Sequence, residues 1–119
     1  MGIEIRGISQ LMRRLDRISS TATTDAVMAG IQKGCLRVEA SAKENCPVDT
    51  GLLRASIDHK LDAGSLSGTV YTNTEYGPAV EFGSIHGPAQ PYMYPALQSN
   101  VANISNDIMV SVREAIRRL

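Results

Sequence analysis

Apolar residues recur every three or four positions in three stretches of the chain, which is the spacing of an amphipathic helix. In the first stretch they are Ile8, Leu11, Met12, Leu15 and Ile18. In the second stretch they are Val27, Ile31, Cys35, Val38, Ala42 and Cys46. In the third and most regular stretch they are Leu97, Val101, Ile104, Ile108, Val112, Ile116 and Leu119. The pattern predicts a short N-terminal helix and two long helices.

Capping residues and prolines set the boundaries of the long helices. Thr24 or Asp25 can cap the first of them, and Pro47 ends it because the residue before a proline is pushed out of the α region. Pro95 suits the first turn of the last helix, which would run for roughly 24 residues or about 36 Å. Because a small sheet cannot cover such a length, part of the apolar stripe on this helix is expected to face another subunit.

Two pairs of small residues lie in the predicted helix that Pro47 ends. Gly30 and Gly34 are four residues apart, and this spacing predicts a close contact with another backbone. Cys35 and Cys46 lie three helical turns apart, roughly 16 Å along the axis, which is too far for a disulfide. They are therefore expected to be free thiols that pack as small hydrophobes in a reducing compartment.

Alternation of apolar and polar residues predicts short strands in two regions. Ile3 and Ile5 alternate with polar neighbours near the start of the chain. Residues 57–62 alternate as well, and residues 68–74 are rich in β-branched and aromatic side chains. A turn of Ala, Gly and Ser separates these last two segments, so they are expected to form an antiparallel hairpin.

The remaining segments complete the predicted fold. Residues 76–82 suit a short helix with Pro78 in its first turn. Residues 83–91 form a Gly- and Pro-rich loop that is long for a compact domain and is therefore expected to be either mobile or functional. The fold class is α+β, with a small antiparallel sheet packed against two long helices and a short N-terminal helix. We expect one domain over residues 1–119.

A corner is expected where the first long helix ends. Asp49, Thr50 and Gly51 form the Asp-Thr-Gly triplet that carries the catalytic carboxylate of aspartic proteases. Such a carboxylate needs a loop between strands of a β-rich fold, whereas here a helix precedes the triplet and helical patterns fill over half of the chain. We therefore interpret Pro47, Asp49, Thr50 and Gly51 as a structural corner, in which Asp49 accepts amide hydrogen bonds and Gly51 takes a positive φ.

No catalytic, cofactor or metal site is predicted. His59 and His86 have no partner at zinc-type spacing, and no Gly-rich phosphate loop follows a strand. No apolar run is long enough to span a bilayer. Arg54 is expected to make a surface salt bridge.

The charges balance, since 12 Lys and Arg face 12 Asp and Glu. This balance disfavours a protein that mainly neutralises nucleic-acid phosphates. It also gives little charge repulsion between molecules, which favours a protein that is part of an assembly. Arginines nevertheless cluster near both ends as candidate contacts to passing DNA or an acidic partner, with solvated helix faces as the alternative. They are Arg13, Arg14, Arg17, Arg113, Arg117 and Arg118.

Aromatic residues gather around the Gly- and Pro-rich loop. Tyr76, Phe82, Tyr92 and Tyr94 either form a local core or face a partner, and the pattern leaves both readings open. No Lys or Arg lies within residues 71–97, which disfavours stacking on nucleic-acid bases there.

Three sequence blocks resemble one family. Residues 47–57 (PVDTGLLRASI), 76–84 (YGPAVEFGS) and 91–97 (PYMYPAL), followed by a long helix, are similar in order and spacing to the small tail-completion or neck proteins of long-tailed bacteriophages, the gene-product-ten-like minor tail components. The resemblance spans residues 3–119. It implies a fold like that of tail-terminator and connector subunits, and a virion protein assembled in the bacterial cytoplasm.

The resemblance also implies partners and a role without catalysis. The chain would form a homo-oligomeric ring, usually six-fold, at the head–tail junction, beside head-closure, tail-terminator or tail-tube proteins. Packaged DNA would pass through the ring without sequence-specific binding, and no membrane would be involved. The alternatives are a tail-terminator ring subunit and, in a different class, a small DNA- or peptide-binding adaptor.

A ring needs two complementary patches on each subunit. The loop 83–91 with its flanking residues is the predicted first patch, and a helix face is the second. The candidate interface residues are Tyr76, Glu81, Phe82, Gly83, Ile85, His86, Pro91, Tyr92 and Tyr94.

Overall fold

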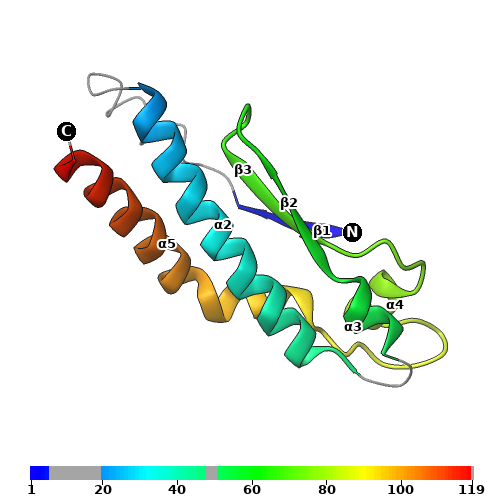
Figure 1. The fold of residues 1–119 in the computed structure, drawn as a ribbon. Coiled ribbons are helices and arrows are strands. Elements are labelled where there is room, and N and C mark those ends of the chain that lie inside the picture. Colours follow the sequence, from blue (N-terminus) through cyan, green and yellow to red (C-terminus); the bar gives the residue numbers. More distant parts are fainter. Residues whose placement is uncertain (6–19, 48–50, 119) are drawn as a thin grey trace.

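Two long helices and a three-stranded sheet make up most of the computed structural model, which describes residues 1–5, 20–47 and 51–118 (Figure 1). The elements are β1 (Gly2–Ile5), α2 (Ser20–Asn45), α3 (Leu52–Ser56), β2 (Asp58–Asp62), β3 (Ser67–Tyr71), α4 (Gly77–Phe82) and α5 (Met93–Arg117). The helix predicted within residues 8–18 lies outside the described residues.

The sheet is antiparallel in the order β1-β3-β2. Val70 of the central strand β3 pairs with Ile3 on one side and with His59 on the other. Helix α2 packs against β2 and β3, and α5 packs against α2 and β1, so both long helices are on one face of the sheet (Figure 1). The α+β class, the strand at Ile3 and Ile5, and the predicted hairpin are all confirmed.

The core follows the apolar stripe of α2. All six predicted positions of this stripe, from Val27 to Cys46, are at most 3% exposed. On α5, Ile104, Ile108 and Val112 are buried against them. Val101 and Ile116 belong to the same predicted stripe of α5, yet they are 51% and 40% exposed. The surplus apolar surface expected on α5 is therefore present.

Helices α2 and α5 approach each other closely at Gly30. A Cβ atom built at Gly30 would lie 2.6 Å from the Cα atom of Ile108, a separation that no side chain tolerates. A Cβ atom at Gly34 would lie 3.0 Å from Cγ2 of Ile104. The predicted close approach at the two glycines is thus confirmed, and the partner backbone is that of α5.

Both long helices begin earlier than predicted. Helix α2 starts at Ser20 rather than at Thr24 or Asp25. Thr23 is only 5% exposed, so tertiary packing stabilises a first helical turn that lies before the predicted capping residues. Helix α5 starts at Met93, two residues before Pro95, because a side chain from α4 satisfies its first amides, as described below.

A five-residue helix, α3, was also missed, because the sequence reads there as a basic and polar segment leading into the hairpin. Only Leu53 of α3 is buried, and five residues show no helical period. The predicted short helix with an early proline is confirmed as α4.

The molecule is elongated, with principal extents of 55 × 21 × 19 Å and a radius of gyration of 16.3 Å. A compact domain of this length would have a radius of gyration of roughly 13–14 Å. An elongated subunit offers more surface for contacts relative to its core.

Candidate functional site

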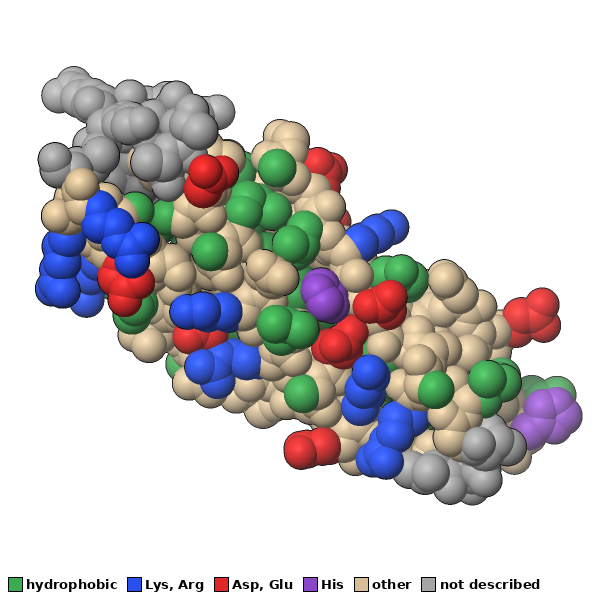
Figure 2. Space-filling model, viewed as in Figure 1, with side chains coloured by type: hydrophobic (Ala, Val, Ile, Leu, Met, Phe, Trp, Pro, Cys, Tyr) green, Lys and Arg blue, Asp and Glu red, His purple; other side chains and the backbone are tan. Residues whose placement is uncertain are grey.

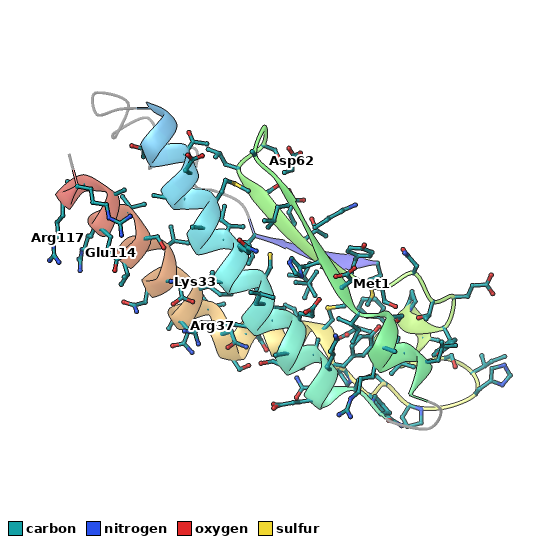
Figure 3. The ribbon with its side chains drawn as sticks, in the orientation of Figure 1. Met1, Lys33, Arg37, Asp62, Glu114 and Arg117 are labelled. Carbon is teal, nitrogen blue, oxygen red and sulfur yellow. The ribbon has the colours of Figure 1, made fainter. Side chains whose placement is uncertain are left out.

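Most predicted interface residues lie at one end of the molecule. This end, here called the loop end, is formed by α3, α4, the loop 83–91 and the first turn of α5 (Figure 1). The C-terminus lies at the opposite end. In Figure 3, Met1 is labelled on the side of the loop end, whereas Arg117 is labelled near the C-terminus.

Glu81 of α4 caps the N-terminus of α5. Its carboxylate accepts hydrogen bonds from the backbone amides of Tyr92 (3.2 Å), Met93 (2.7 Å) and Tyr94 (3.3 Å). The first amides of a helix have no partner within the helix, and a negative charge also favours the helix N-terminus. Glu81 is only 5% exposed. Its predicted role on the subunit surface is therefore corrected to a capping role inside the subunit.

Tyr92 is also internal. Its ring is fully buried, and its hydroxyl donates a hydrogen bond to the carbonyl oxygen of Gly77 at 3.0 Å. This contact joins α4 to the start of α5 and satisfies the only polar group of the side chain. The prediction of Tyr92 as an interface residue is wrong for this reason. Of the two readings left open for the aromatic group, the local core applies to Tyr92.

We expect the stability of the protein to fall as the pH rises from about 9 to about 12. Burial, helped by the charge of Glu39, raises the pKa of the Cys35 thiol from 9.0 to about 11. Burial, helped by the charges of Glu81 and Cys46, raises the pKa of Tyr92 from 10.0 to about 12. The folded state keeps each proton at a pH where the unfolded chain has lost it, so the stabilisation is complete below the unfolded pKa and disappears as the pH rises through the folded pKa.

Urea unfolding at pH 8 and pH 10.5 measures this effect, which between these two pH values should be roughly 2 kcal/mol for Cys35 and below about 1 kcal/mol for Tyr92. A Cys35→Ala chain should lose less stability between these two pH values than the unsubstituted chain does. Equal unfolding midpoints at both pH values would contradict the prediction.

The loop 83–91 holds a rigid tip. Gly83 has a φ of 84°, which favours glycine, and turns the chain out of α4. Ser84 and Gly87 then exchange two backbone hydrogen bonds of 3.0 and 3.2 Å, which leaves Ile85 and His86 at the turn between them. The hydroxyl of Ser84 accepts from the amide of His86 at 3.2 Å. Further along, the amide of Gln90 donates to the carbonyl oxygen of Val80 at 2.8 Å. The tip is therefore preorganised.

Exposed apolar side chains are found on this tip and elsewhere at the loop end. Ile85 is 96% exposed, Phe82 73%, Tyr94 57% and Tyr76 40%. Full burial of one such side chain would stabilise a complex by about 1.5–3 kcal/mol. A rigid turn that displays an isoleucine almost completely to water is typical of a contact surface. The partner-facing reading thus fits these aromatic residues, and their interface role stays a prediction.

A small hollow lies beside the exposed aromatic side chains. It has a volume of about 140 Å³ and is lined by Met1, Gly2, Ile3, Glu81, Phe82, Met93 and Tyr94. All of these except Glu81 are apolar, and the carboxylate of Glu81 is already used by the amides at the start of α5. The hollow can therefore take an apolar group.

The corner after α2 matches its prediction in part. Gly51 has the expected positive φ of 76° and precedes α3 directly. Asp49 and Thr50 lie outside the described residues. Arg54 donates to the carbonyl oxygen of Lys43 at 2.8 Å and so satisfies the C-terminus of α2. Its expected surface salt bridge stays a prediction. Helices flank the Asp-Thr-Gly triplet on both sides, which is not the setting of an aspartic protease loop.

A polar cluster between α2 and β2 was not predicted, because its residues come from two separate segments of the sequence. Ligand atoms of Glu39, Asp58 and His59 lie within 4.8 Å of one another, close enough to surround a cation. However, Nδ1 of His59 lies 3.2 Å from Oε1 of Glu39, and the amide of His59 donates to Asp58 at 2.7 Å. Each group already has a partner, so the cluster is explained by holding β2 against α2. His86, by contrast, is exposed at the loop tip.

The described arginines of the predicted clusters lie at the C-terminal end. Arg113 and Arg117 are exposed on the last turns of α5, and Arg118 is exposed directly after it. Figure 2 shows acidic side chains among the basic ones at this end, and Figure 3 labels Glu114 beside Arg117. The surface there is mixed in charge. Arg13, Arg14 and Arg17 lie outside the described residues.

The sulfur chemistry agrees with the prediction. Cys35 and Cys46 are both free and buried. None of the helices in the described part of the chain is long and apolar enough to cross a membrane.

The fold is a small α+β domain, and its most exposed apolar side chains, Ile85 and Phe82, lie at the loop end. Residues 9–83 match the family model described as "Bacteriophage HK97-gp10, putative tail-component", and the chain belongs to this family. The match contains the first similar block and nearly all of the second, while the block at 91–97 lies beyond it. No curated protein and no solved structure matches the chain. The family is one of structural components of phage tails.

Proposed function

We propose that this protein is a neck or tail-completion subunit that forms a ring around the DNA channel at the head–tail junction. In this role it links the head-closure complex to the tail, and packaged DNA passes through the lumen. A six-fold ring is the expected stoichiometry. The family membership gives the wider assignment to phage tails, and the loop end supports the finer one.

The observation that carries the proposal is the rigid display of Ile85 beside exposed aromatic side chains on an elongated subunit. Such surface is costly for a free protein in water and is expected where neighbouring subunits cover it. The mixed charges at the C-terminal end fit a lumen that DNA passes without being held, since strong binding would need a basic excess.

Electron microscopy of assembled particles tests the position. We expect density for this chain as a closed ring between the portal and the tail tube. Phage that lack the chain should yield filled heads and separate tails. A ring at the end of the tail tube in tails never joined to heads would instead indicate a tail-terminator subunit. Density at the distal tail tip would contradict both assignments.

Removal of the loop tip tests the contact surface. The amide nitrogen of Ala89 would lie 2.9 Å from a Cβ atom at Gly83, so the chain can close directly between these residues when 84–88 are deleted. The deleted chain should unfold at nearly the same urea concentration as the intact chain, because the removed residues are exposed. It should fail to join heads to tails in a complementation assay. Normal yields of joined particles would refute a role for the loop.

A further inference from the structure

We infer that Ile85 of one subunit inserts into the hollow at the loop end of a second copy of this chain. This inference rests on the proposed ring and names the contact between neighbouring subunits. It replaces the helix face expected as the second patch with a defined hollow, lined by the start of β1, the end of α4 and the start of α5.

The two surfaces fit each other in size and chemistry. An apolar cavity of roughly 150 Å³ accepts a group the size of benzene. The hollow measures about 140 Å³, and the four-carbon side chain of Ile85 is smaller than benzene. The rim carries Phe82 and Tyr94, which are 73% and 57% exposed and would close around an inserted side chain. A small knob surrounded by water-excluding aromatics is typical of the strongest part of an interface.

Ile85 does not occupy the hollow of its own subunit. It is 96% exposed and is not among the residues that line the hollow, and the paired backbone hydrogen bonds of Ser84 and Gly87 fix the turn that carries it. In Figure 1 the loop projects beyond α4. Ile85 can therefore be buried in such a hollow only on another molecule.

A second copy is the occupant because the chain carries both halves of the contact. The formal net charge is zero, so copies do not repel one another strongly. A knob that fits a different surface of the same protein makes a heterologous contact, and such contacts close into rings when the rotation allows. Every subunit of a ring would then bury one Ile85 and fill one hollow.

Directed cross-linking in assembled particles tests the contact. One chain carries Ile85→Cys and a second carries Tyr94→Cys, and both are supplied to phage that lack the unsubstituted chain. After oxidation, particles that contain both variants should show a disulfide-linked dimer on a non-reducing gel. Particles that contain either variant alone should not. The native thiols do not compete, because Cys35 and Cys46 are buried and burial raises their pKa values.

The outcomes separate this inference from the proposed function. If both variants are present at the junction and no cross-link forms, the inference is wrong and the proposed function stands. If the unsubstituted chain is itself absent from the junction, the proposed function fails and the inference fails with it. A chain that carries both substitutions should give a ladder of cross-linked oligomers in particles, and a product that never exceeds two chains would overturn the ring contact.

Three substitutions measure the contribution of the knob. Ile85→Asp should lower incorporation into particles by about tenfold or more, because a charge cannot enter an apolar hollow. Ile85→Leu should be incorporated normally. Leu36→Asp changes another exposed apolar side chain, 46% exposed on α2, which belongs neither to the loop nor to the lining of the hollow, and should also be incorporated normally. Circular dichroism should show the same fold for all three. Equal incorporation of Ile85→Asp and Leu36→Asp would refute the inference.

Discussion

Glu81→Ala is expected to destabilise the protein by about 3–4 kcal/mol, which is a large part of the stability of an ordinary domain. The substitution leaves three backbone amides at the start of α5 without their carboxylate acceptor. Tyr92 and Met93 are at most 1% exposed, so water cannot easily replace the lost oxygens. The cost is that of buried donors left unsatisfied, together with a lost helix cap.

Urea unfolding followed by circular dichroism measures this loss. Glu75→Ala is the matched control, because Glu75 has the same charge and is exposed just before α4. It should change the free energy of unfolding by no more than about 0.5 kcal/mol. Glu81→Gln, which keeps one acceptor oxygen, should lie between the two. Hydrogen exchange should be faster at the amides of residues 92–94 in Glu81→Ala. If the Glu81→Ala and Glu75→Ala chains unfold at the same urea concentration, the cap does not contribute to stability.

Gly30→Ala is expected to destabilise the protein by about 2–3 kcal/mol, although alanine is the better helix former by about 1 kcal/mol. The new methyl group would lie 2.6 Å from the Cα atom of Ile108, and a backbone atom cannot move aside without shifting α5. The sign of the effect is therefore diagnostic, since helix propensity alone predicts a gain in stability.

Gly34→Ala is the control for this contact. Its methyl group would meet Cγ2 of Ile104 at 3.0 Å, and a side chain can adjust by a few tenths of an ångström. The gain in helix propensity should then nearly offset the strain, so the free energy of unfolding should change by less than about 1 kcal/mol. Thermal or urea unfolding of both variants checks the pair. A Gly30→Ala chain that is more stable than the original would show that the helices are not in close contact there.

Local patterns in the sequence were sufficient for the larger elements. The buried stripe of α2 and the positions of β2 and β3 follow from periods of 3.6 and 2 residues, which need no knowledge of distant residues. The two-glycine signal correctly indicated a close helix contact, although it did not identify α5 as the partner. Helix α3 escaped prediction because five residues with one buried side chain carry no period.

The candidate site was less predictable. The loop and its aromatic neighbours were recognised from Gly, Pro and Tyr content, yet Tyr92 and Glu81 were placed on the surface. Their actual positions depend on hydrogen bonds between residues 11 to 15 apart in the sequence, across a loop whose path no local rule determines. The same holds for the contact of His59 with Glu39, which joins a strand to a helix.

The sequence by itself determined the α+β class, the two long helices, the loop 83–91 and the family to which the chain belongs, because local periodicity or contiguous motifs indicate each of them. Only the tertiary structure decided which residues of that loop region are buried and which are displayed. Burial depends on how α4, β1 and α5 meet in space. That meeting places Glu81 and Tyr92 inside, leaves Ile85 in water, and forms the hollow that we propose a neighbouring subunit fills.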